Sequence, residues 1–261
     1  MRLHDAYDLI EDEFNRQLDE SLDPSSPDSL FEYVAQMGLP AGSVAVDVGC
    51  GEGEYAVELA DRFGFAVTGI DLVPRLVEEA RLSVPPGRPV DFKVGSAENL
   101  PLATGLADLI WSRDVLSLID NQDGAYREVR RVLKPGGRAL IYQTFTTSRL
   151  QPSEAAFLLP VMACSAAAMD PENAEAAMRD AGLRIDICVV LGSQWGEYYQ
   201  EHARAPRSHS LHAARLLRDP DRYIHRFGKE NYDIKLGDCL WHIYRMLGKL
   251  SGRVYVLSAP A

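Results

Sequence analysis

The sequence contains little that would cross-link a chain covalently or hold it in a membrane. Its four cysteines, Cys50, Cys164, Cys188 and Cys239, form no Cys-x-x-Cys pair and accompany no clustered histidines. We therefore expect reduced, mostly buried thiols and neither a disulfide framework nor a structural zinc site. No apolar run approaches the roughly 20 residues that span a bilayer, and the charged N-terminus lacks the apolar core of a signal peptide. These absences predict a cytoplasmic protein without membrane contact.

Positive charge is also in short supply. The 27 lysines and arginines face 38 aspartates and glutamates, so the formal net charge is −11 at pH 7. Such a surface repels polyanions, which argues against a nucleic-acid partner and favours a small-molecule substrate. The 261 residues, 46% of them hydrophobic, suffice for one large domain with an elaborated cap. The sequence does not predict an oligomeric state.

Apolar strand patterns alternate with helical periodicity in the first part of the chain. This alternation predicts a doubly wound α/β sheet, mostly parallel and seven-stranded, with a helical cap. The strands read as nearly continuous apolar runs, as expected where both faces of the sheet are covered. We expect an N-terminal helical cap over residues 1–40, a ligand-binding core over 41–145, and cap helices with the last strands over 146–261.

Three glycines within residues 49–53 follow the first predicted strand and Asp47. The dinucleotide fingerprint needs a glycine where Glu54 stands, and the phosphate-binding P-loop needs a lysine that is absent. Asp47, Glu52 and Glu54 also make the loop unfavourable for a pyrophosphate. The loop therefore suits a ligand that is positive or neutral at this point.

Five motifs stand in order between residues 44 and 145: "VDVGCGEGEY", "TGIDL", "GSAENLPL", "ADLIWSRDVLSLID" and "VLKPGGRALIY". In this order they resemble the class I S-adenosylmethionine-dependent methyltransferases. The resemblance implies a Rossmann-like fold. It also implies S-adenosylmethionine as the cofactor, S-adenosylhomocysteine as its product, and no metal.

The resemblance also assigns parts of the cofactor to residues. The glycine backbone approaches the methionyl part, and Asp71 accepts hydrogen bonds from both ribose hydroxyls. Ser96 stands where the family commonly has aspartate at the adenine, so the contact involves its hydroxyl or shifts to the backbone of Ala97. The cofactor-binding residues expected in this way are Asp47, Gly49, Cys50, Gly51, Gly53, Asp71, Leu72, Ser96, Ala97, Glu98, Ser112 and Arg113.

The implied reaction is an in-line displacement at the sulfonium methyl, in which the protein aligns the acceptor and excludes water. The cap region resembles phosphoethanolamine-type methyltransferases, but Leu118 stands where those enzymes often carry histidine. A base cannot be transferred from them to this chain. Asp114 is expected to face the transfer site. Tyr7 and Glu197 are further catalytic candidates. The alternative for Tyr7 is that it packs at the interface with the sheet, and the alternative for Glu197 is that it is a solvent-exposed carboxylate without a catalytic role.

The later part of the chain carries the information about the substrate. Two pairs of residues have helical i, i+4 spacing: Trp195 with Tyr199, and Tyr198 with His202. These side chains either line a pocket for a ring-shaped substrate of specialised metabolism or pack in the core. An arginine-rich stretch over residues 204–226 either receives an anionic substrate group or is a solvated face. Oxygen is the first choice of acceptor and an amine nitrogen the second. A third possibility is a protein that binds the cofactor without transferring its methyl group.

Overall fold

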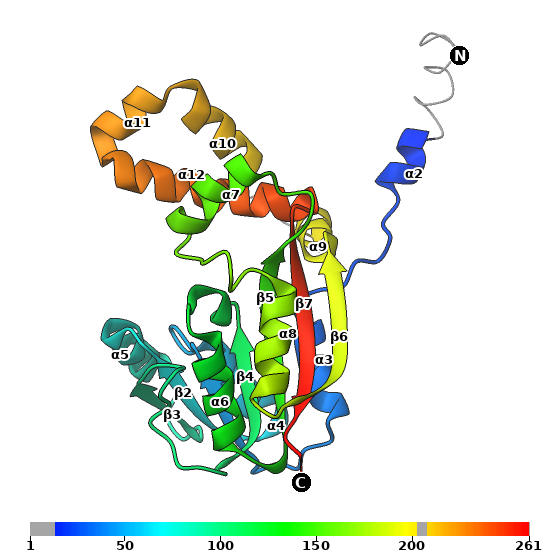
Figure 1. Ribbon diagram of the computed structural model, residues 1–261, viewed down its shortest axis with the longest axis vertical. Coiled ribbons are helices and arrows are strands. Elements are labelled where there is room, and N and C mark those ends of the chain that lie inside the picture. The colour runs from blue at the N-terminus through cyan, green and yellow to red at the C-terminus, as the bar shows by residue number, and fades with distance from the viewer. Residues whose placement is uncertain (1–13, 203–207, 261) are drawn as a thin grey trace.

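The computed structural model describes residues 14–202 and 208–260, and these residues form one seven-stranded sheet with helices on both faces and a helical cap (Figure 1). The strands are β1 Val44–Val48, β2 Ala66–Asp71, β3 Val90–Val94, β4 Ala107–Arg113, β5 Leu133–Thr146, β6 Arg184–Gly192 and β7 Leu250–Ser258. The helices are α2 Asn15–Asp19, α3 Ser29–Gln36, α4 Glu54–Phe63, α5 Pro74–Ser83, the 3₁₀ turn η2 Leu116–Leu118, α6 Gln122–Val132, α7 Pro152–Val161, α8 Pro171–Asp180, α9 Gln194–His202, α10 His209–Arg218, α11 Pro220–Phe227 and α12 Lys229–Met246.

The strand order is β3-β2-β1-β4-β5-β7-β6. β7 runs antiparallel to both of its neighbours, and the remaining pairs from β3 to β5 are parallel. This topology confirms the predicted doubly wound, mostly parallel Rossmann-like sheet. Because ligands of open α/β sheets bind beyond the carboxyl ends of the strands, the loops after β1, β2 and β4 share one edge where a site can form.

Alternating strand residues serve two separate cores. Val46 faces a cluster that includes residues of α6 and α8, whereas its neighbour Ala45 faces a cluster that includes residues of α3, α4 and α5. In Figure 1, α6 and α8 lie in front of the sheet and α3 and α4 lie behind it. Both faces are therefore covered, which explains why the strands are apolar throughout.

The cap lies above the carboxyl ends of the strands and consists of α7, α10, α11 and α12 (Figure 1). α12 is its central element, since it packs against α7, α9, α10, α11 and β7. Pro220 separates α10 from α11 and occupies the first turn of α11, with Asp219 as the capping residue. No helix in the described ranges is both long and apolar enough to cross a membrane.

The described residues before β1 contribute to the core through α3 and contact α9 through the segment that precedes α3. Although the sequence predicts a cap over residues 1–40, Leu30, Phe31 and Val34 of α3 are buried in the core. The segment before α3 instead runs beside α9, where the backbone N–H of Ser25 donates to Gln194 at 3.2 Å. α3 is thus a covering helix of the sheet, and the stretch preceding it contacts α9.

All four cysteines are free thiols. Cys50, Cys164 and Cys239 are buried, as predicted, whereas Cys188 is exposed. Cys188 lies on β6, whose position at the end of the strand order leaves one of its edges unpaired.

Candidate active site at the carboxyl edge of the sheet

The glycine loop between β1 and α4 contains one glycine that the protein's own packing does not require. Gly49, Gly51 and Gly53 all have positive φ, at 77°, 53° and 87°. A Cβ on Gly49 would lie 2.0 Å from Val115, and one on Gly53 would lie 2.5 Å from Phe92, whereas one on Gly51 would meet no atom of residues 14–202 or 208–260 within 4 Å. Open space therefore adjoins the backbone of Gly51.

Asp47 is the penultimate residue of β1, beside this loop, and its carboxylate is incompletely satisfied. The residue is 2% exposed, and its Oδ2 atom has no hydrogen-bond partner among the described residues. Burial raises its pKa to about 7, the charge of Asp71 adds to this effect, and a hydrogen bond from the backbone of Ala56 opposes it. A cationic ligand group would stabilise the ionised form of this carboxylate.

Asp71 ends the neighbouring strand β2 and holds the glycine loop in place. Its Oδ2 accepts the backbone N–H of Gly51 and its Oδ1 accepts that of Val73, both at 2.9 Å. Leu72 beside it is 68% exposed, an apolar surface adjacent to the polar loop. The Cys50 side chain is buried in the core, its N–H donates to the carbonyl of Ile70, and its carbonyl accepts the N–H of Gly53.

The other predicted cofactor residues lie on the loop after β3 and at the end of β4. The Ser96 hydroxyl accepts the backbone N–H of Glu98 at 3.1 Å, and Glu98 is exposed while Ala97 is buried. Ser112 is buried and donates its hydroxyl to the carbonyl of Val48 at 3.1 Å, which joins the ends of β4 and β1. The ends of β1 to β4 thus bring the predicted residues to one edge of the sheet.

Asp114 follows β4 directly and is held in an unusual conformation. Its φ of 56° is left-handed, a region that aspartate tolerates better than most residues. Its Oδ1 accepts the Thr144 hydroxyl at 2.8 Å, and its N–H donates to the carbonyl of Tyr142 at 2.9 Å. Burial raises its pKa, which Arg245, the Thr144 hydrogen bond and Arg113 partly counteract. The geometry gives a carboxyl group with a fixed direction and an environment that disfavours its charge.

Aromatic rings and guanidinium groups surround Asp114. Trp195 stacks on Tyr142 with ring centroids 4.3 Å apart, and the Arg113 guanidinium lies 5.5 Å from the Trp195 ring. Arg245 of α12 donates to the Tyr142 hydroxyl at 2.5 Å. Trp195 Nε1 and Arg113 Nε are buried and have no hydrogen-bond partner in the part of the chain that the structure describes. These two N–H groups are available to an acceptor atom of a bound molecule.

Tyr142 and Arg245 were not singled out from the sequence. Thr144 was not singled out either; Tyr142 lies two residues before it and hence on the same face of β5, but the sequence links neither residue to Asp114. Arg245 carries no sequence signal, because it belongs to a cap helix far along the chain and reaches the sheet edge only through the fold.

Helix α9 does not gather its predicted aromatic residues into one wall. Trp195 is 2% exposed and packs on the sheet, whereas Tyr199 is 53% exposed. Tyr198 and His202 do stack, with centroids 4.3 Å apart, as their i, i+4 spacing predicts, and His202 is exposed. Glu197 accepts a hydrogen bond from the Ser193 hydroxyl. Only Trp195 of this set therefore touches the surroundings of Asp114.

Two predicted features lie wholly or partly outside the described residues. Tyr7 is one, so its predicted role stays a prediction. The arginine-rich stretch over residues 204–226 is described from residue 208 onward. There Arg215 and Arg222 belong to different helices, α10 and α11, rather than to one continuous face.

The chain has clear relatives among known proteins. Residues 46–141 match a family model described as a methyltransferase domain. The ubiquinone biosynthesis O-methyltransferase of Xanthomonas axonopodis pv. citri is 33% identical over 181 residues, which cover 63% of this chain and 73% of that protein.

Solved structures show the same fold over more of the chain. The phosphoethanolamine N-methyltransferase 2 of Haemonchus contortus, in complex with phosphomonomethylethanolamine and S-adenosylhomocysteine, has a TM-score of 0.69 at 20% identity and covers 92% of this chain and 54% of its own. The structure of the [4+2]-cyclase SpnF has a TM-score of 0.69 at 22% identity, and the match covers 98% of this chain and 95% of the SpnF chain. The ordered motifs, the sheet and these relatives together lead to one conclusion: the chain belongs to the class I S-adenosylmethionine-dependent methyltransferases.

Proposed function

We propose that this methyltransferase methylates a hydroxyl oxygen of a small-molecule acceptor at the edge of the sheet below the cap. The observation that carries the proposal is the carboxyl group of Asp114, whose direction is fixed by Thr144 and which Arg113 and Arg245 influence electrostatically. S-adenosylmethionine, when bound, supplies an electrophilic methyl group together with its leaving group. The chain's own residues then have to bind, align, exclude water and accept a proton.

The residues of the glycine loop fit this cofactor. Gly51 leaves open space beside the backbone, and the buried Oδ2 of Asp47 has no partner, which suits a ligand with cationic groups. Asp71 and the exposed Leu72 would hold its ribose and an apolar part. The proposed cofactor-binding residues remain Asp47, Gly49, Cys50, Gly51, Gly53, Asp71, Leu72, Ser96, Ala97, Glu98, Ser112 and Arg113.

The charges near Asp114 favour an oxygen acceptor over an amine. The pKa of Asp114 is raised by burial, and Arg245 and Arg113 each oppose that rise, so two positive charges act on one carboxyl group. A protonated amine would be repelled by this surplus, whereas a neutral phenol or alcohol would not. The unpartnered N–H groups of Trp195 and Arg113 also suit an acceptor molecule that carries oxygen atoms.

Asp114 would accept the proton of the acceptor hydroxyl as the oxygen attacks the methyl group. Thr144 directs the carboxyl group, and Arg245 links cap helix α12 to the Tyr142 hydroxyl on β5. The stack of Trp195 on Tyr142 closes this side with aromatic surface and excludes water. Tyr7 and Glu197 remain proposed catalytic candidates, and Trp195, Tyr198, Tyr199 and His202 of α9 remain proposed substrate contacts.

A panel of phenols, hydroxy acids and amines, incubated with S-adenosylmethionine labelled in its methyl group, tests the proposal. We expect label on the oxygen of at least one hydroxyl compound. With that acceptor, Asp114→Asn should lower kcat by about a hundredfold or more, the usual contribution of a general base, and leave cofactor affinity unchanged. Because the pKa of Asp114 is raised, wild-type activity should decline as the pH is lowered, and the decline should begin at a pH above the ordinary pKa range of a carboxyl group.

Asp120→Asn is the matched control, since Asp120 is an exposed carboxylate on the same loop. Its kcat and pH profile should equal those of the wild type. Transfer to amines alone would contradict the proposal, and so would an Asp114→Asn variant that retains full activity and the acidic limb of the profile.

A further inference from the structure

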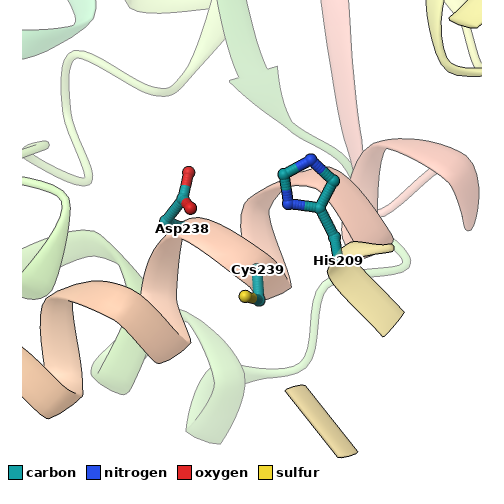
Figure 2. Close-up of side chains that lie close together, drawn as sticks. All are labelled: His209, Asp238 and Cys239. Atoms are coloured by element: carbon teal, nitrogen blue, oxygen red, sulfur yellow. The ribbon is translucent and has the colours of Figure 1, made fainter. Parts of the chain in front are cut away.

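Three potential metal ligands meet in the cap, away from the glycine loop. His209 is the first residue of α10, and Asp238 and Cys239 are consecutive residues of α12 (Figure 2). A ring nitrogen, a carboxylate oxygen and the thiol sulfur from these residues all lie within 4.8 Å of one another. The packing of α10 on α12 brings them together, although nothing in their sequence spacing indicates a site.

Neighbouring groups orient this cluster. The His242 ring stacks on the His209 ring with centroids 3.8 Å apart and planes 20° from parallel. Lys235 binds Oδ2 of Asp238 at 2.8 Å, while Oδ1 lies 3.8 Å from His242 Nε2. Cys239 is fully buried, whereas Asp238 is partly exposed and leaves the cluster open to solvent on one side.

We propose that His209, Asp238 and Cys239 bind a divalent zinc-class cation that joins α10 to α12. Imidazole nitrogen, carboxylate oxygen and thiolate sulfur are the donors that zinc takes in tetrahedral sites, and three protein ligands leave the fourth position to water. On coordination, Cys239 loses its thiol proton to solvent, and the sulfur forms the bond to the metal. The ammonium group of Lys235 remains on the other oxygen of Asp238.

The three ligands belong to cap helices α10 and α12 and include none of the residues proposed for methyl transfer. The effect of a bound cation would fall on the cap. A cavity of about 440 Å³ lies between α10, α11 and α12, with Leu216, Tyr223, Phe227 and Tyr232 among its lining residues. A bound cation would hold α10 and α12 together beside this cavity. Because the cation would bind only the folded state, it would also stabilise that state.

Titration of the full-length, chelator-treated protein with zinc chloride in a calorimeter tests the proposal, together with a parallel titration with cobalt(II) followed by absorbance. We expect one ion per chain, a thiolate-to-cobalt charge-transfer band and a higher melting temperature with zinc. Cys239→Ser and His209→Gln should each raise the Kd for zinc by at least about tenfold. Removing a residue that only hydrogen-bonds to a metal ligand already lowers metal affinity by about that factor. Cys239→Ser should also remove the band.

Cys188→Ser and His212→Gln are the matched controls, an exposed cysteine on β6 and an exposed histidine on α10. Both should bind zinc like the wild type. If the wild-type protein with cobalt(II) shows no thiolate-to-cobalt charge-transfer band, that result alone would overturn the proposal. Unchanged zinc affinity in Cys239→Ser, shown by circular dichroism to be folded, would also overturn it.

Discussion

Replacing Asp47 with asparagine should make the ligand-free protein more stable at about pH 8 and weaken its binding of S-adenosylmethionine. Burial raises the pKa of Asp47 from 3.8 to about 7, so the folded state binds this proton more tightly than the unfolded state does. Stability therefore falls as the pH rises from about 4 through 7, and the full cost of ionisation is present above pH 7. A shift of this size corresponds to about 4 kcal/mol at most.

Asparagine has nearly the same shape and is neutral at every pH, so the variant escapes this cost. We expect its free energy of unfolding in urea to exceed that of the wild type by about 2–4 kcal/mol near pH 8, and the difference to shrink toward pH 4. In the same variant, the Kd for S-adenosylmethionine should rise about tenfold or more, because a hydrogen bond to a charged group is lost.

Asp91→Asn provides the control, since Asp91 is exposed on β3. It should show neither the pH-dependent gain in stability nor the loss of affinity. An Asp47→Asn protein that is less stable than the wild type at pH 8 would contradict the assignment of a buried carboxylate that is costly to ionise. Unchanged cofactor affinity would contradict its placement at the cofactor.

Gly51→Asn should abolish cofactor binding while the protein stays folded. Gly51 has a φ of 53°, which asparagine tolerates better than most residues, and its Cβ would meet no protein atom within 4 Å. The new side chain would instead fill the open space in which we place the cofactor. We expect no detectable heat of binding with S-adenosylmethionine and a loss of stability of about 1 kcal/mol.

Gly87→Asn tests whether this effect is local. Gly87 also has a positive φ, 87°, and open space around its Cβ, but it is exposed on the loop before β3. It should cost similar stability and leave affinity intact. If Gly51→Asn binds S-adenosylmethionine like the wild type, the open space beside Gly51 is not the cofactor site.

The sequence predicts the sheet well because its signals are local. Apolar runs, the glycine-rich loop after β1 and Pro74 at the start of α5 each indicate an element within a few residues. The sequence does not show which glycines of the loop are required by packing. That distinction depends on Val115 and Phe92, which the fold brings against Gly49 and Gly53 from distant strands and loops.

The surroundings of Asp114 and the cap are harder to predict for the same reason. Arg245 reaches the Tyr142 hydroxyl only because α12 packs over the end of β5, and no spacing in the sequence indicates this contact. Trp195 has the same helical spacing to Tyr199 whether it faces a substrate or the core, and only the fold shows that it stacks on Tyr142. The cluster of His209 with Asp238 and Cys239 likewise arises from packing between helices.

The most direct test of the central claim is a calorimetric titration of the wild-type protein with S-adenosylmethionine, S-adenosylhomocysteine and NAD. The account predicts that both sulfur compounds bind with one site per chain and that NAD does not bind, because the loop has Glu54 where a dinucleotide loop has glycine. Binding of NAD, or no binding of either sulfur compound to the folded protein, would contradict the account.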